Sequence, residues 1–127
     1  MVNHSSVVLC VEDDLGTQEM LRVLLGERGY GFEVAGTRAD ALRLIQEKEI
    51  ALVLLDNMLP DGNGVELCRQ VREFNKQLPI IFVSGSAHED ERQEALGSGA
   101  NAFLTKPLAL DKLFATLDAY APLQYQG

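Results

Sequence analysis

Three carboxylates, a hydroxyl and an ammonium group stand at or just after the ends of short apolar runs in this sequence. In chain order they are Glu12, Asp13, Asp56, Ser84 and Lys106. Crowded carboxylates repel one another unless they share protons or bind a cation. Mg²⁺ suits such a group, because it prefers hard oxygen ligands and leaves room for phosphate oxygens. Beside a cation, Asp56 is suited to attack phosphorus, while Lys106 and Ser84 stabilise charge on the phosphoryl oxygens.

The chain around these residues alternates apolar runs with stretches of helical periodicity. Strands are expected at 7–11, 31–35, 50–55, 80–83 and 101–105, and helices at 15–28, 39–48, 64–74, 87–96 and 110–120. Apolar strands separated by amphipathic helices predict an α/β fold with a parallel five-stranded sheet covered on both faces. In such sheets the ligand crevice lies beyond the carboxyl ends of the strands. We therefore expect the polar residues to meet at one rim.

Length, charge and composition limit the class of protein. The 127 residues suffice for one domain, expected at 1–127 with a core at about 7–120. A net charge of −8 argues against direct nucleic-acid binding, because little would neutralise the phosphates. No apolar run is long enough to span a bilayer, and no signal peptide is recognisable. Cys10 and Cys68 are expected to be buried free thiols.

Each polar residue also has an ordinary structural interpretation. Asp14 is as well suited to cap the following helix as to join the site. The pairs at 61–62 and 63–64 are turn formers. Ser84 alone would be a strand-end hydroxyl bonded to the backbone, and Lys106 alone a solvated charge. The functional interpretation depends on their joint occurrence at the strand ends.

Four motifs at their observed spacing resemble the receiver domain of bacterial two-component response regulators, over Val7 to about Tyr120. They are VEDD at 11–14, LLDNMLPDGNG at 54–64, VSGSA at 83–87 and FLTKP at 103–107. The resemblance implies a flavodoxin-like, doubly wound (βα)5 sandwich with strand order 2-1-3-4-5. It also implies a Mg²⁺-dependent switch that accepts a phosphoryl group from a histidine kinase phosphohistidine.

The resemblance assigns Asp56 as phosphoacceptor and as a metal ligand. Asp13 would ligate Mg²⁺ directly, Glu12 through water, and Met58 through its backbone carbonyl. The site would thus combine the acceptor with three other groups that hold the cation.

The same resemblance assigns the switch. Ser84 matches the hydroxyl that moves to the phosphoryl group, Lys106 the lysine that pairs with it, and Phe103 the aromatic switch position. The Lys106–Pro107 bond would be cis. Ser84 stands where Thr is more frequent and Gly85 where Ala is frequent. Phe103 lacks the hydroxyl of a Tyr, which puts in doubt any partner contact that needs one.

The movement of Ser84 would empty space that Phe103 fills by rotating inward. This would reshape the face made by the fourth helix, fifth strand and fifth helix. The thin apolar face of 87–96 suits a weakly held helix that is able to shift.

The resemblance also implies partners and a location. They are a sensor histidine kinase or phosphotransfer protein, and a downstream effector domain or protein bound at the reshaped face. We expect a cytoplasmic switch without membrane contact, which phosphorylates and dephosphorylates its own Asp56 but is not a turnover enzyme. Dimerisation on phosphorylation, the output, the kinase, and whether this receiver stands alone or belongs to a larger regulator stay open.

Three other functions compete with this interpretation. A pseudo-receiver that only binds partners would lack the acceptor, the acidic pair or the lysine. A flavin-binding protein would place a phosphate-binding loop where VEDD stands. An acid phosphohydrolase using Asp56 would need a second acid where Met58 stands, and an inserted cap domain. Phosphotransfer from a phosphoramidate donor with Mg²⁺ separates all of them.

Overall fold

Five strands rich in Val, Leu and Ile form a parallel sheet in the computed structural model, which describes residues 6–86 and 88–123. In chain order they are β1 (Val7–Val11), β2 (Gly31–Ala35), β3 (Leu52–Asp56), β6 (Ile80–Ser84) and β7 (Ala102–Thr105). They pair in the order β2-β1-β3-β6-β7. Without the short hairpin strands described below, this is the order 2-1-3-4-5, so the predicted flavodoxin-like fold is confirmed.

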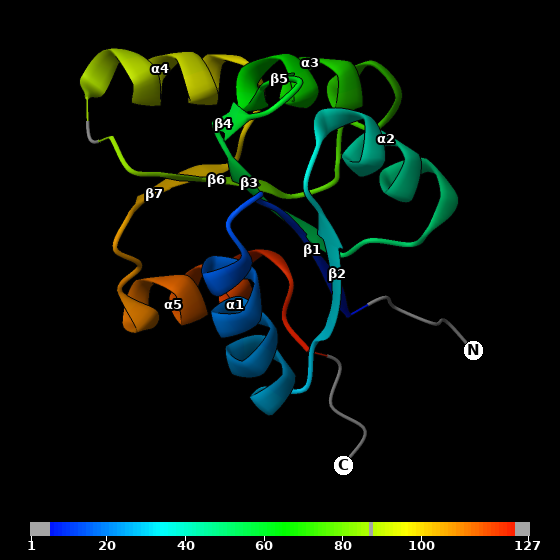
Figure 1. Ribbon diagram of the computed structural model, residues 1–127, viewed down its shortest axis with the longest axis vertical. Coiled ribbons are helices and arrows are strands. Elements are labelled where there is room, and N and C mark those ends of the chain that lie inside the picture. Colours follow the sequence, from blue (N-terminus) through cyan, green and yellow to red (C-terminus); the bar gives the residue numbers. More distant parts are fainter. Residues whose placement is uncertain (1–5, 87, 124–127) are drawn as a thin grey trace.

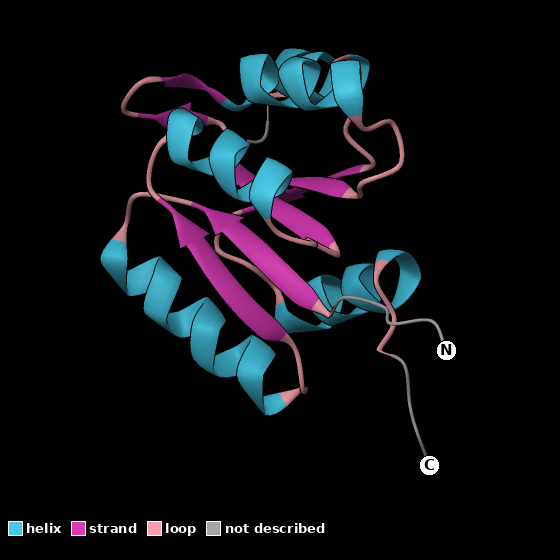
Figure 2. Cartoon of the chain, turned by 90° about the vertical axis from the view of Figure 1, so that its right-hand side faces the viewer, coloured by secondary structure: helices cyan, strands magenta, loops and turns pink. Residues whose placement is uncertain are grey.

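Five helices cover the sheet in two layers, with α1 and α5 on one face and α2, α3 and α4 on the other (Figure 1). Their bounds are α1 (Leu15–Glu27), α2 (Arg38–Glu47), α3 (Gly64–Phe74), α4 (Glu89–Gly97) and α5 (Leu110–Tyr120). Figure 2, turned by 90°, shows the strands running between the two helical layers. The expected order of five βα units is therefore confirmed. The bounds of α3 and α5 agree with the prediction, and those of α1, α2 and α4 differ by one or two residues. Position 87, the predicted start of the fourth helix, lies outside the described residues.

The core consists of two apolar clusters on opposite faces of the sheet. Successive side chains of a strand point to opposite faces, so Leu55 joins the cluster under α2, α3 and α4, while Leu54 joins the one under α1 and α5. On β6, Phe82 and Ile81 divide in the same way. Burial on both faces explains why these strands are apolar throughout.

The segment after Asp56 contains a small hairpin that the turn signals did not predict. β4 (Met58–Leu59) pairs antiparallel with β5 (Gly62–Asn63). Gly62 has a φ of +152°, a conformation that favours glycine. Asp61 accepts hydrogen bonds from the N–H groups of Arg38 at 2.6 Å and Ala39 at 3.1 Å. The hairpin therefore ties the segment after Asp56 to the N-terminus of α2.

The strand expected at 50–55 begins at Leu52 and extends to Asp56, which is thus the last residue of β3. Cys10 and Cys68 are buried free thiols, as predicted.

Within the described ranges, no helix has the length and apolar character required to cross a membrane.

Candidate functional site

The carboxyl ends of β1 and β3 bring three carboxylates together. One oxygen from each of Glu12, Asp13 and Asp56 lies within 4.8 Å of the others. Glu12 is buried, Asp56 is half-buried and Asp13 is exposed. The predicted acidic cluster at the rim is thereby present, and its exposed side gives a ligand access to it.

Lys106 is the cation that contacts this cluster. Its Nζ donates to Glu12 Oε1 at 2.7 Å and approaches Asp56 Oδ2 at 3.5 Å. Burial by itself lowers the pKa of Lys106, but the hydrogen bond to Glu12 and the charges of Asp56 and Glu12 outweigh it and raise the pKa. Lys106 therefore stays protonated beside Asp56.

The donor set fits Mg²⁺. One ammonium contacts two of the carboxylates, so the three acids together keep excess negative charge that a divalent cation would neutralise. All three donors are hard oxygens, the type that Mg²⁺ selects. Cys10 lies close behind, but burial, with the charges of Glu12 and Asp56 opposing that of Lys106, raises its thiol pKa to about 12. A protonated thiol is no metal ligand.

Asp14 caps a helix and is not a member of the carboxylate cluster. Its Oδ2 accepts hydrogen bonds from the Thr17 N–H and the Thr17 hydroxyl, both at 2.8 Å. These bonds lower the pKa of Asp14. The structure therefore supports the capping interpretation.

Met58 lies two residues after Asp56. Its N–H donates to Asp56 Oδ1 at 3.1 Å, while its side chain is exposed. The role of the Met58 carbonyl as a metal ligand stays a prediction.

Ser84 is buried at the end of β6, and its hydroxyl is bonded on two sides. The Oγ accepts from the Ser86 N–H at 3.2 Å and donates to Glu91 Oε1 at 2.9 Å. Glu91 Oε1 also accepts from Asn57 Nδ2 at 2.9 Å. Glu91 and Asn57 were not predicted from the sequence, since Glu91 is one of several acids in a polar helix and Asn57 resembles a turn residue.

Hydrogen bonds favour the charged form of Glu91. The bond from the Ser86 hydroxyl lowers its pKa most, and those from Asn57 and Ser84 lower it further against desolvation. Asn57 uses its amide N–H group in this network, and its buried Oδ1 has no hydrogen-bond partner among the described residues. Glu91 is thus a further carboxylate near the acidic cluster, and neutral donors hold it.

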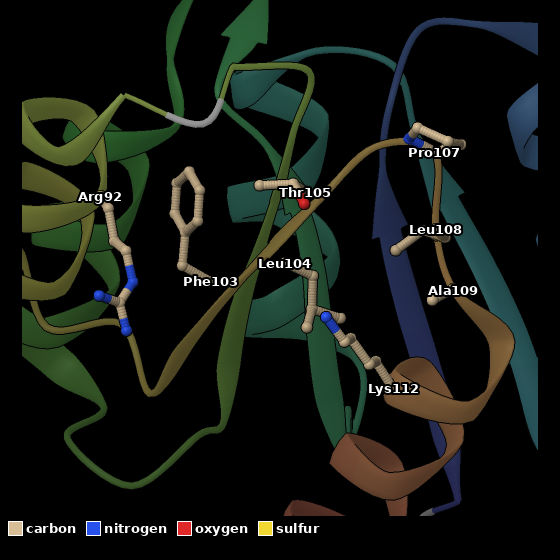
Figure 3. Close-up of a pocket in the computed structure, with 8 residues that line it drawn as sticks. All are labelled: Arg92, Phe103, Leu104, Thr105, Pro107, Leu108, Ala109 and Lys112. Atoms are coloured by element: carbon tan, nitrogen blue, oxygen red, sulfur yellow. The ribbon is translucent and has the colours of Figure 1, made fainter.

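Phe103 lies on β7 beside a shallow pocket of about 200 Å³. Figure 3 shows the ring between β7 and the helix that carries Arg92, with Lys112 of α5 on the other side of the pocket. The ring stacks on Phe82 with centroids 6.4 Å apart. Phe103 is half-buried, and its predicted rotation stays a prediction. The Lys106–Pro107 bond is cis, as predicted.

A family model described as the response regulator receiver domain matches residues 8–118. The chain belongs to this family. Its strand order, its acidic cluster and the lysine that contacts it agree with that assignment.

Known receivers resemble the chain in sequence and structure. The response regulator MprA of Mycobacterium sp. (strain KMS) is 38% identical over 112 residues, 88% of this chain and 49% of that protein. The chain therefore spans about half the length of the curated relatives it matches. The non-phosphorylated HemR receiver domain of Leptospira biflexa is 33% identical, with a TM-score of 0.84 over 97% of this chain and 99% of that one. The BeF3-activated RstA receiver domain of Klebsiella pneumoniae is 28% identical, with a TM-score of 0.85 over 90% and 97%.

Proposed function

We propose that this receiver domain accepts a phosphoryl group on Asp56 from the phosphohistidine of a histidine kinase or phosphotransfer protein. The observation that carries the proposal is the cluster of Glu12, Asp13 and Asp56 within 4.8 Å, with Lys106 against it. The domain acts as a cytoplasmic signalling switch and not as a turnover enzyme.

The reaction is an in-line transfer to a carboxylate. An oxygen of Asp56 forms a bond to phosphorus as the bond between phosphorus and the imidazole nitrogen breaks, and that nitrogen keeps the electron pair. Asp13, Asp56, the Met58 carbonyl and, through water, Glu12 would hold Mg²⁺, which would supply charge neutralisation between the two anions.

Lys106 supplies the second positive charge. Its ammonium already lies 3.5 Å from Asp56 Oδ2, so it is placed to bind an oxygen of the transferred group. The Met58 N–H holds Asp56 Oδ1 and thereby orients the acceptor. Both contacts exist before the phosphoryl group arrives, which reduces the reorganisation that the reaction requires.

The output follows from the change of charge at Asp56. A phosphoryl group adds about −1.5 to −2 charges and several acceptor oxygens. Ser84 turns to it, Phe103 moves inward, and the face of α4, β7 and α5 around the pocket of Figure 3 changes for an effector. The RstA relative, described as BeF3-activated, supports such activation by a phosphoryl mimic.

Phosphorylation by a labelled phosphoramidate tests the proposal. With Mg²⁺, the wild type should acquire an acid-labile phosphoryl group, Asp56→Asn should acquire none, and chelation of the metal should stop labelling. Asp61→Asn is the matched control, because Asp61 bonds to the start of α2 and lies outside the cluster. Label at the wild-type level in Asp56→Asn would place the acceptor elsewhere. An unlabelled wild type would indicate a pseudo-receiver.

A further inference from the structure

Glu91 lies on α4, outside the metal-binding cluster, yet it contacts the predicted switch hydroxyl. A single carboxylate oxygen, Oε1, accepts from Ser84 Oγ and from Asn57 Nδ2, each at 2.9 Å. Ser84 is the last residue of β6, and Asn57 directly follows β3. Glu91 therefore links α4 to the residue after Asp56 and to the end of the neighbouring strand.

The hydroxyl of Ser84 has only one proton to donate. In this structure Ser84 donates that proton to Glu91. A hydrogen bond from Ser84 to a phosphoryl oxygen needs the same proton, so the two acceptors exclude each other. Because Glu91 is charged, its bond is of the stronger, charge-assisted kind.

The rest of α4 is weakly attached. Ala95 is the only buried residue of the helix, and His88 at its N-cap makes no side-chain cap bond. Among the described residues, Glu91 makes no ion pair that could replace its bond to Ser84, while its helix neighbour Arg92 approaches Glu89 at 3.8 Å. Hydrogen bonds from Ser84, Asn57 and Ser86 to Glu91 therefore hold the N-terminal turn of α4, and loss of the Ser84 bond removes one of them.

We propose that Glu91 is a positioning residue that competes with the phosphoryl group for the Ser84 proton. It holds Ser84 in the unphosphorylated arrangement and keeps the start of α4 at the site. Phosphorylation breaks this bond, which couples the chemistry at Asp56 directly to α4. This inference rests on the proposed function.

Binding of beryllofluoride with Mg²⁺ measures the competition, since it mimics the phosphoryl group at Asp56. Glu91→Ala removes the competing acceptor and should lower the half-saturating concentration about tenfold, the size expected for a charge-assisted hydrogen bond. Glu91→Gln keeps a weaker, neutral acceptor and should show a smaller gain. Asp90→Ala, an exposed acid one residue earlier on the same helix, should bind as the wild type does.

A second set of variants separates competition from a structural or purely electrostatic effect. In a Ser84→Ala background there is no proton to compete for, so Glu91→Ala should change the half-saturating concentration less than about threefold. An equal gain in both backgrounds would overturn the proposal. Melting temperatures for all variants identify any that fail to fold, and Glu91→Gln, which keeps the side-chain shape, then carries the test.

The outcomes also separate the two proposals. If the wild type and Asp90→Ala bind no beryllofluoride in the presence of Mg²⁺, the proposed function is wrong and the competition with it. If the wild type binds and neither Glu91 variant binds more tightly, the inference about Glu91 alone is wrong.

Discussion

The helices α3 and α4 lie next to each other on the same face of the sheet, but different interactions hold them (Figure 1). α3 has five buried residues and an N-cap, Asn63, whose side chain accepts from the Glu66 N–H. α4 has one buried residue, and its N-cap makes no such bond. Burial stabilises the first, while polar contacts to Ser84, Ser86 and Asn57 hold the start of the second.

The difference matches the places of the two helices in the chain. α3 comes after the hairpin that follows Asp56, and the proposed reaction needs Asp56 to stay fixed. α4 follows the strand that ends at Ser84, and the proposed switch needs the Ser84 hydroxyl to move. A helix held by apolar packing cannot shift without a large loss of free energy, whereas exchange of one hydrogen bond for another costs little. The weak packing of α4 is thus what the proposed switch requires.

Truncation of one leucine in each helix should show the largest contrast. Leu67 on α3 is fully buried, so Leu67→Ala should reduce the free energy of unfolding by about 2–5 kcal/mol. Leu96 on α4 is half-buried, and Leu96→Ala should cost about 1 kcal/mol or less. Urea unfolding measures both. Similar losses at the two positions would mean that packing holds α4 as firmly as α3.

Substitution of one glycine in each helix by Ala should change the free energy of unfolding by smaller amounts, with opposite signs. A Cβ at Gly64, the first residue of α3, would lie 2.9 Å from the Asp56 carbonyl oxygen and 2.9 Å from Phe82 Cε2. Gly64→Ala should therefore destabilise by about 1–3 kcal/mol. A Cβ at Gly97, the last residue of α4, meets nothing within 4 Å. Gly97→Ala should stabilise by about 0.5–1 kcal/mol.

Thermal unfolding of the two glycine variants checks the signs. A stabilised Gly64→Ala would show that α3 can move away from Asp56, which would contradict the firm packing of α3. A destabilised Gly97→Ala would show that the C-terminal end of α4 is packed more closely than the structure indicates.

The smallest expected effect concerns pH. Hydrogen bonds, the one from Ser86 foremost, lower the pKa of Glu91 in the folded protein. A carboxyl with a lowered folded pKa stabilises above its unfolded pKa, and this contribution is lost as pH falls through the folded value. The difference in free energy of unfolding between wild type and Glu91→Gln should therefore shrink as pH falls from about 7 to about 3. It should stay below about 1 kcal/mol, because Glu91 is only half-buried and solvent still screens its charge.

Urea unfolding at a series of pH values measures this difference in free energy of unfolding. Glu94→Gln is the control, since Glu94 is an exposed acid on the same helix. If the free energies of unfolding of the wild type and Glu91→Gln differ by the same amount across this pH range, the charge of Glu91 does not stabilise α4.

Much of the fold was predictable because strands buried on both faces are apolar throughout. The apolar runs that end at Val11 and Val83 show this pattern, and the next residues along the chain are Glu12 and Ser84. The hairpin of β4 and β5 was not predicted, since two-residue strands have no periodicity to detect. It depends instead on contacts between Asp61 and the start of α2, which are distant in sequence.

One part of the site was likewise predictable from the sequence and another was not. The cluster of Glu12, Asp13 and Asp56 was predictable, because topology alone brings strand ends together. The contact between Ser84 and Glu91 was not, since it depends on how a polar helix is oriented, and the pattern of α4 is too uniform to indicate which acid points inward.

Amide chemical shifts test the central claim, that occupation of Asp56 moves α4 and leaves α3 in place. Spectra of the wild type with Mg²⁺ alone and with Mg²⁺ plus beryllofluoride would be compared at the C-terminal halves of both helices, away from the ligand. Clear shifts are expected at residues 94–97 of α4 and little change at 68–74 of α3. Equal shifts in the two segments, or changes confined to α3, would contradict it.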